Sequence, residues 1–161
     1  MLGAWSAIDP GLDVDAYEVT ARVSRIALHI ARHQEEVFGR FGLNRGDMGV
    51  LSALRIAGPP NQLSPTTLFK GLMLSSAGIT SRLDRLEGRG LVRRARHPND
   101  RRGILVELTD EGRSVLDEAV KANSVVEREL VAGLDQKDLR SLATLLRKML
   151  AGLETETGGT R

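Results

Sequence analysis

The sequence predicts a mainly α-helical fold that contains one small β-hairpin. Two observations carry this prediction. Apolar residues recur every three or four positions through long stretches near both ends of the chain, which is the spacing of one face of an α-helix. Residues 104–108 instead alternate apolar and polar side chains after a Pro-Asn-Asp turn, which is the pattern of a hairpin strand.

Composition limits the classes of protein to which the chain can belong. Its 161 residues, 41% of them apolar, suit one domain with a buried core, alone or with accessory helices. We expect no membrane-spanning helix, because no apolar run approaches 18 residues, and no secretory signal at the N-terminus. The absence of cysteine excludes disulfides, thiolate metal sites and thiol redox sensing. We therefore expect a cytoplasmic protein.

The first two expected helices follow an irregular lead-in over residues 1–12. One helix covers residues 14–41, and the next runs to about residue 57. Asn44, followed three positions later by Asp47, is the pattern of a capping box at the start of the second helix. A Gly-Pro-Pro-Asn sequence at 58–61 then forces a break.

Two short helices come next. Ser64 as the N-cap and Pro65 at the first helical position open a helix that ends near Gly71. A second helix starts at Ser75 or Ser76 and ends before Gly90, with an inward face formed by Ile79, Leu83 and Leu86. Two short helices joined by a tight turn, the second polar and basic on its outer side, are typical of a helix-turn-helix.

Positive charge is concentrated in the second of these helices and in the hairpin after it. Residues 82–102 contain eight arginines and three acidic residues, a surplus of five charges in a chain whose net charge is +2. Arginine has a permanent charge and a planar set of donors that fits phosphates and guanine edges. A solvated protein face gives the same pattern, so charge alone does not decide between the two interpretations.

Two longer helices complete the chain. Thr109 caps one over residues 110–131, and Asp135 caps the last. The polar tail from Glu154 is expected to be disordered. The helices at both ends carry apolar stripes that must be buried, and a second subunit is the natural place to bury them.

Three pieces of the central part of the chain stand out by their order and spacing: RLDRLEGRGLVRR at 82–94, DRR at 100–102 and LTDEGR at 108–113. In these pieces the chain resembles the MarR family of transcriptional regulators. The resemblance is densest over residues 63–118 and extends outward to roughly residues 12–153. It implies a winged helix-turn-helix, in which the hairpin is the wing, flanked by N- and C-terminal dimerisation helices.

The resemblance also implies a domain organisation and a set of partners. Residues 1–43 form a lead-in and dimerisation helix, 44–109 the DNA-binding unit, 110–153 the C-terminal dimerisation helices, and 154–161 the tail. The protein is then a homodimer that binds a pseudopalindromic operator in double-stranded DNA and represses transcription, with no membrane partner. Its recognition helices enter successive major grooves, and its wings reach the flanking minor grooves.

Residues that contact DNA are assigned through the resemblance, by position. Specificity is expected from the polar residues of the recognition helix and Arg82, while Arg85 is placed for phosphates or for ion pairs with the core. In the wing, Asp100 braces the tip and Arg102 inserts into the minor groove, unless the two only pair to hold the turn. The full set is Ser75, Ser76, Thr80, Ser81, Arg82 and Arg85 on the helix, and Arg94, Arg96, Asp100, Arg101 and Arg102 on the wing.

A small-molecule effector is a further implication of the resemblance. Many such regulators are repressors released by small anionic or aromatic molecules. Trp5, Arg82 and Arg94 are similar to the ligand pocket of the urate- and purine-responsive branch. The aspartate of that pocket is replaced by Gly49, and Asp47 lies two positions earlier, where it points elsewhere on a helix. An alternative interpretation of Trp5 is an apolar anchor over the dimer helices.

Other functional classes find little support in the sequence. His29 and His33 have the spacing of two metal ligands on one helix, but two histidines alone are weak evidence, and we expect no metal or cofactor. No motif of a hydrolase, nucleotide-binding enzyme or metalloprotease is present, so we expect no enzyme and no catalytic residues. The remaining alternative is a winged-helix protein without effector response, acting as a constitutive DNA binder or a protein-interaction adaptor.

Overall fold

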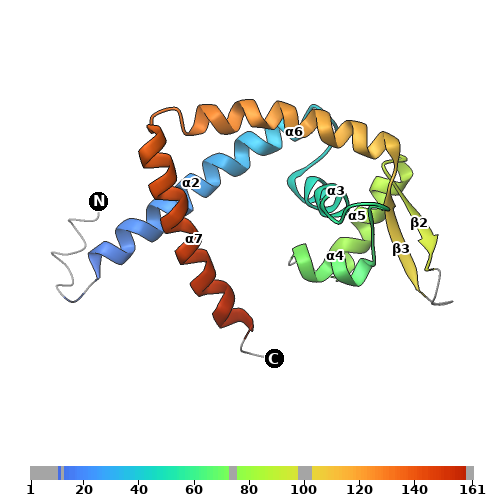
Figure 1. The fold of residues 1–161 in the computed structure, drawn as a ribbon, viewed down its shortest axis with the longest axis horizontal. Helices are drawn as coiled ribbons and strands as arrows, with labels where there is room; N and C mark the ends of the chain where they lie inside the picture. Colours follow the sequence, from blue (N-terminus) through green and yellow to red (C-terminus); the bar gives the residue numbers. More distant parts are fainter. Residues whose placement is uncertain (1–10, 12, 73–75, 98–102, 159–161) are drawn as a thin grey trace. The chain divides into compact units, whose positions relative to one another are not determined.

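The computed structural model describes residue 11 and residues 13–72, 76–97 and 103–158. These residues form helices and one three-stranded antiparallel sheet with the strand order β1-β3-β2. Figure 1 shows the helices and the hairpin of β2 and β3. The chain divides into two compact units, Met1–Ser124 and Val125–Arg161. None of the helices described is both long and apolar enough to cross a membrane.

Helices α2 (Val14–Gly39) and α3 (Arg45–Ile56) come first in the described chain. Asp13 caps α2 by accepting a hydrogen bond from the backbone N–H of Ala16 at 3.0 Å. The capping box expected at α3 is confirmed: Asn44 accepts from the N–H of Asp47 at 2.9 Å, and Asp47 accepts from the N–H of Asn44 at 3.1 Å.

The expected helix-turn-helix consists of α4 (Pro65–Leu72) and α5 (Ser76–Gly88). Ser64 accepts a hydrogen bond from the N–H of Thr67 at 3.1 Å, which confirms it as the cap of α4. Ile79, Leu83 and Leu86 of α5 are buried as expected, each at most 3% exposed, so this helix is held to the core by one face.

The hairpin is formed by β2 (Val92–Arg96) and β3 (Ile104–Leu108), with Arg94 opposite Val106. Its expected inward face is confirmed for Val106 and Leu108, whereas Ile104 is half exposed. Sequence patterns did not predict β1 (Gln62–Leu63), because a two-residue strand has no periodicity of its own and forms only by pairing with β3. The wing tip, residues 98–102, lies outside the described residues.

Helix α6 (Asp110–Leu130) begins at a tight junction with the hairpin. The Thr109 hydroxyl donates to the carbonyl oxygens of Gly90 and Leu91 at 2.7 and 3.0 Å, and accepts from the N–H of Gly112 at 2.9 Å. A Cβ at Gly112 would overlap the carbonyl oxygen of Leu91. Within the LTDEGR sequence, the hydroxyl of Thr109 therefore links the start of α6 to the start of the wing, and Gly112 leaves room for the Leu91 backbone.

Helix α7 (Gln136–Gly158) is the last element. The expected cap is confirmed, since Asp135 accepts hydrogen bonds from the N–H groups of Lys137 and Asp138, both at 2.8 Å. The expectation of a disordered tail from Glu154 is wrong for residues 154–158, which continue the helix. The alternation of Glu and Thr there lacks an apolar stripe but contains no helix breaker before Gly158.

Candidate nucleic-acid interface

The outer face of α5 is polar and accessible. Thr80 and Ser81 are exposed, while the opposite face of the helix is buried in the core. Ser76 is the first residue of α5, and Ser75 lies outside the described residues. A helix held on one face with short polar side chains on the other has the form of an element that enters a DNA groove.

The guanidinium groups of Arg82 and Arg85 on α5, and of Arg89 directly after it, turn toward α3 and the residues before it. Arg82 is only 19% exposed: its Nη1 donates to Oδ1 of Asn44 at 2.7 Å and lies 3.3 Å from Oδ1 of Asp47. Arg85 forms an ion pair with the same carboxylate, and its side chain is 49% exposed. Arg89 donates to the carbonyl oxygens of Phe41, at 2.9 Å, and Gly42. These three arginines therefore contact residues 41–47, which comprise the connection between α2 and α3 and the first turn of α3.

This arrangement changes the interpretation of Arg82. The sequence placed its guanidinium among the groups that read bases, whereas the structure has it turned toward the N-terminus of α3. The sequence left two alternatives for Arg85, a phosphate contact or an ion pair with the core, and the structure shows the ion pair. The partners were hidden from sequence reasoning because they lie 35 and 38 residues from the arginines along the chain.

Asp47 is the centre of this cluster. Its side chain is 1% exposed, and it carries the second half of the α3 capping box as well as both ion pairs with α5. A buried carboxylate is tolerated only when charged or hydrogen-bonding groups surround it. The cap could be predicted from Asn44 and Asp47, but no local pattern signals the two ion pairs.

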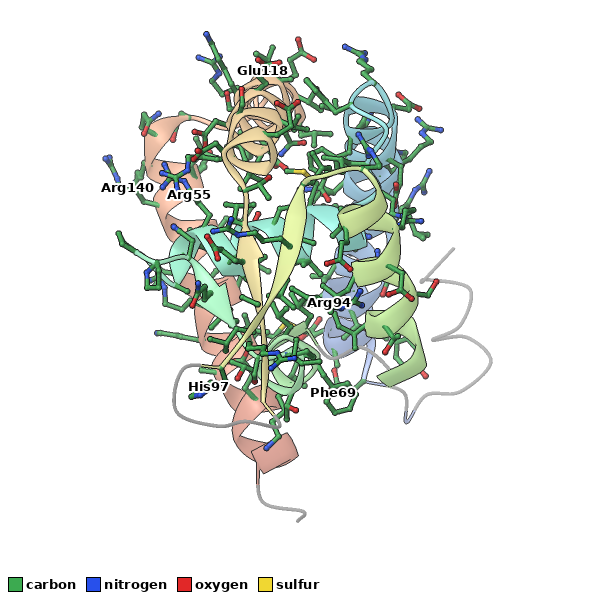
Figure 2. All side chains as sticks on the ribbon, turned by 90° about the vertical axis from the view of Figure 1, so that its right-hand side faces the viewer. Arg55, Phe69, Arg94, His97, Glu118 and Arg140 are labelled. Carbon is green, nitrogen blue, oxygen red and sulfur yellow. The ribbon has the colours of Figure 1, made fainter. Side chains whose placement is uncertain are left out.

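Arg94 bridges the wing and α5 in the same way. Its guanidinium pairs with Asp84, 2.6 Å away, and with Glu87, and its backbone N–H donates to Glu87 at 2.9 Å. Figure 2 shows Arg94 between the hairpin and α5. The hydrogen bond to Asp84, followed by that to Glu87, raises the pKa of Arg94. Arg94, which the sequence assigned to a DNA contact in the wing, therefore holds β2 to α5.

A second polar contact crosses the sheet. Glu107 of β3 accepts hydrogen bonds from Arg93 on one neighbouring strand and from Gln62 on the other, the latter at 2.9 Å. The hydrogen bond from Arg93 lowers the pKa of Glu107 below its ordinary value. Arg96, near the end of β2, is exposed, whereas Asp100, Arg101 and Arg102 lie outside the described residues.

The candidate ligand residues are only partly described. Trp5 lies outside the described residues, and Arg82 and Arg94 have the carboxylate partners given above. The expectation that Asp47 points away from these residues is wrong, because its Oδ1 lies 3.3 Å from Nη1 of Arg82. Within the described part of the chain, no group of three or more metal-binding side chains occurs. Nδ1 of His33 lies 4.0 Å from Oε2 of Glu36 on the same helix.

Comparison with known proteins shows the family. A family model described as the MarR family matches residues 41–103. The regulator PecS of Dickeya dadantii, an HTH-type transcriptional regulator, is 33% identical over 145 residues, which cover 90% of this chain and 87% of PecS. The chain belongs to the MarR family.

Solved structures of MarR-family proteins share the fold. Sco3205, a MarR family transcriptional regulator from Streptomyces coelicolor solved in complex with DNA, has a TM-score of 0.77 and 28% identity. The match covers 88% of this chain and 93% of Sco3205. BpsR of Bordetella bronchiseptica, whose DNA binding is regulated by 6-hydroxynicotinic acid, has a TM-score of 0.70 and 27% identity, over 81% of this chain and 91% of BpsR.

Family membership settles the broad function. This MarR-family chain is a DNA-binding transcriptional regulator and not an enzyme. The expected mainly helical winged helix-turn-helix is confirmed by the observed elements and by the structural relatives.

Proposed function

We propose that this MarR-family regulator is a homodimeric repressor, and that each protomer reads half of a pseudopalindromic operator with α5 and its wing. The observation that carries the proposal is the polar outer face of α5 around Thr80 and Ser81, opposite a buried apolar face. Short hydroxyl side chains on such a face can approach base edges closely.

The proposed DNA contacts are divided between the helix and the wing. On α5 we assign base contacts to the hydroxyl residues and phosphate contact to the exposed part of Arg85. On the wing we assign contacts to the arginine that ends β2 and to the arginines after it. Arg82 and Arg94 leave this set, because their guanidinium groups hold α5 against α3 and β2. The assigned residues are Ser75, Ser76, Thr80, Ser81 and Arg85 on the helix, and Arg96, Arg101 and Arg102, with Asp100 as a brace, on the wing.

Uncovered apolar side chains support the homodimer. Along α2, Tyr17, Val19, Ile26 and Leu28 are exposed in the single chain, and so are Leu145 and Leu150 of α7. Apolar residues repeated along a helix mark an interaction surface when solvent reaches them. A second copy of the same two helices would bury these stripes in an isologous interface.

A small anionic or aromatic effector is proposed by analogy with BpsR, whose DNA binding is regulated by 6-hydroxynicotinic acid. Trp5, Arg82 and Arg94 remain the candidate ligand residues. Two observations favour the alternative of a DNA binder without an effector: both arginines already have carboxylate partners, and Gly49 stands where the urate-responsive branch has an aspartate.

Hydroxyl-radical footprinting tests the proposed function. Duplexes that the protein selects from a random library are expected to show two symmetric protected half-sites about one helical turn apart, because a two-fold dimer places its recognition helices in successive grooves. A single asymmetric footprint would contradict the dimeric reading of the operator. Releasing the DNA with aromatic carboxylates or purines, but not with acetate, would support the effector. Release by none of them would favour the constitutive binder.

A further inference from the structure

We propose that Asp47 is a positioning residue for DNA recognition, which fixes the angle of α5 through Arg82 and Arg85 and keeps Arg82 from binding DNA indiscriminately. The inference rests on the proposed function, because it assumes that α5 reads the operator. Asp47 itself belongs to α3 and is 1% exposed, so it acts on DNA only through its partners.

The geometry joins one carboxylate to two successive turns of the recognition helix. Arg82 and Arg85 are three positions apart, so their side chains leave the same side of α5, and both reach Oδ1 of Asp47. Two attachment points on one helix restrain its rotation as well as its distance from α3. A recognition helix that keeps its rotation presents the same side chains to the groove floor.

Asp47 is itself held rigidly by the start of α3. Its Oδ2 accepts the N–H of Asn44, and its own N–H donates to Oδ1 of Asn44, which also accepts from Arg82. The capping box therefore fixes the carboxylate, and the carboxylate fixes the arginines. Because these groups share one network, we expect their effects on DNA binding to be strongly non-additive.

Gly46 provides the space for this contact. A Cβ at residue 46 would overlap the guanidinium of Arg82, so the close approach of Arg82 to the N-terminus of α3 requires a residue without a side chain. The clash is with the far end of a flexible side chain, which would swing away and leave the α3 backbone in place. Gly46 thus offers a way to displace Arg82 without changing any charge.

Loss of the ion pairs has two opposite consequences for DNA binding. Operator binding weakens, because α5 no longer presents its outer face at one angle. Binding to unrelated DNA strengthens and becomes more salt-dependent, because Arg82 is released from its carboxylate on a helix that faces phosphates. A role of Asp47 in folding alone would lower both affinities together.

The test compares Asp47→Asn with the wild-type protein on a selected duplex and on a scrambled duplex across a salt series. Asparagine keeps an oxygen that can accept the N–H of Asn44, so the cap is retained while the charge is lost. We expect the ratio of the two affinities to fall by about tenfold or more, equivalent to one lost base contact. The slope of log affinity against log salt on scrambled DNA should steepen by about one for each arginine that reaches a phosphate.

Two matched controls separate positioning from general effects. Asp117→Asn removes the same charge from an exposed carboxylate on α6 and releases Arg55, so it should leave the affinity ratio unchanged. Gly46→Ala should lower the ratio as Asp47→Asn does, whereas Gly39→Ala, with open space around its new Cβ, should not. Alanine is the better helix former by about 1 kcal/mol, so a defect of Gly46→Ala would not come from helix propensity. If Asp47→Asn does not fold, the affinity ratios of Gly46→Ala and Gly39→Ala decide whether the contact between Arg82 and α3 positions α5.

The outcomes separate this inference from the proposed function. A wild-type protein that binds selected and scrambled DNA equally would refute the proposed function and the inference with it. A wild-type preference that Asp47→Asn and Gly46→Ala both retain would refute the inference alone. A parallel loss on both duplexes would assign Asp47 to folding and overturn its positioning role.

Discussion

The junction between the wing and α6 gives a sharp prediction, because it is built on a glycine. We predict that Gly112→Ala destabilises the protein. The new Cβ would overlap the carbonyl oxygen of Leu91 and lie 2.9 Å from Cδ1 of Leu108. The Leu91 backbone cannot move aside as a flexible side chain can. Overpacking of this kind lowers the free energy of unfolding by about 1–3 kcal/mol.

Two further effects enter the magnitude. The Leu91 carbonyl accepts both the N–H and the hydroxyl of Thr109, at 3.2 and 3.0 Å, and a shift would weaken bonds of about 1 kcal/mol each. The higher helix propensity of alanine offsets about 1 kcal/mol. We therefore expect the free energy of unfolding of Gly112→Ala to fall by about 2–3 kcal/mol.

Urea unfolding at one fixed protomer concentration measures this change, since the stability of the proposed homodimer would depend on concentration. Gly152→Ala in α7 is the control: nothing lies within 4 Å of its new Cβ, and it should be neutral or slightly stabilising. A Gly112→Ala protein as stable as the wild type would refute the packing argument.

Three other predictions concern the sheet and the wing. Arg94→Ala would leave the carboxylates of Asp84 and Glu87 unpaired next to the proposed DNA interface. Operator affinity measured by fluorescence anisotropy should then fall by about tenfold or more, and Arg94→Lys should restore part of it. An unchanged affinity would contradict the bridging role of Arg94. Because the pKa of Glu107 is lowered from 4.5, its contribution to stability is complete above pH 4.5 and is lost as the pH falls through the folded pKa. Thermal unfolding should then show Glu107→Gln less stable than wild type at pH 7, with the gap closing as the pH falls below 4.5. A gap that stays constant with pH would exclude this linkage. Arg102→Ala should weaken operator binding by about 1–3 kcal/mol while sedimentation still shows a dimer, and full affinity would remove the wing tip from the mechanism.

Local sequence patterns predicted the elements that depend on local interactions. The caps at Ser64, Asn44 and Asp135 follow from hydrogen bonds within three residues, and the inward face of α5 follows from its helical period. Strand β1 escaped prediction because its two residues are strand only by pairing with β3, more than 40 residues away.

The candidate site was predicted less completely than the fold. Arginine content identified α5 and the wing as the basic region, but composition says nothing about which guanidinium groups have partners. Arg82 and Arg94 are engaged by carboxylates that the tertiary fold brings to them. The outer face of α5, which we propose to face DNA, is consequently described better by its hydroxyl residues than by its charge.

A DNA-binding titration is the most direct test of whether this regulator recognises a specific operator. Purified protein is titrated by fluorescence anisotropy onto the DNA upstream of its own gene and onto a scrambled duplex, across a salt series. We predict tight binding that exceeds the scrambled duplex by about a thousandfold. Equal, weak and steeply salt-dependent binding to both would contradict operator recognition at that site, and no binding to either duplex at low salt would contradict the account as a whole.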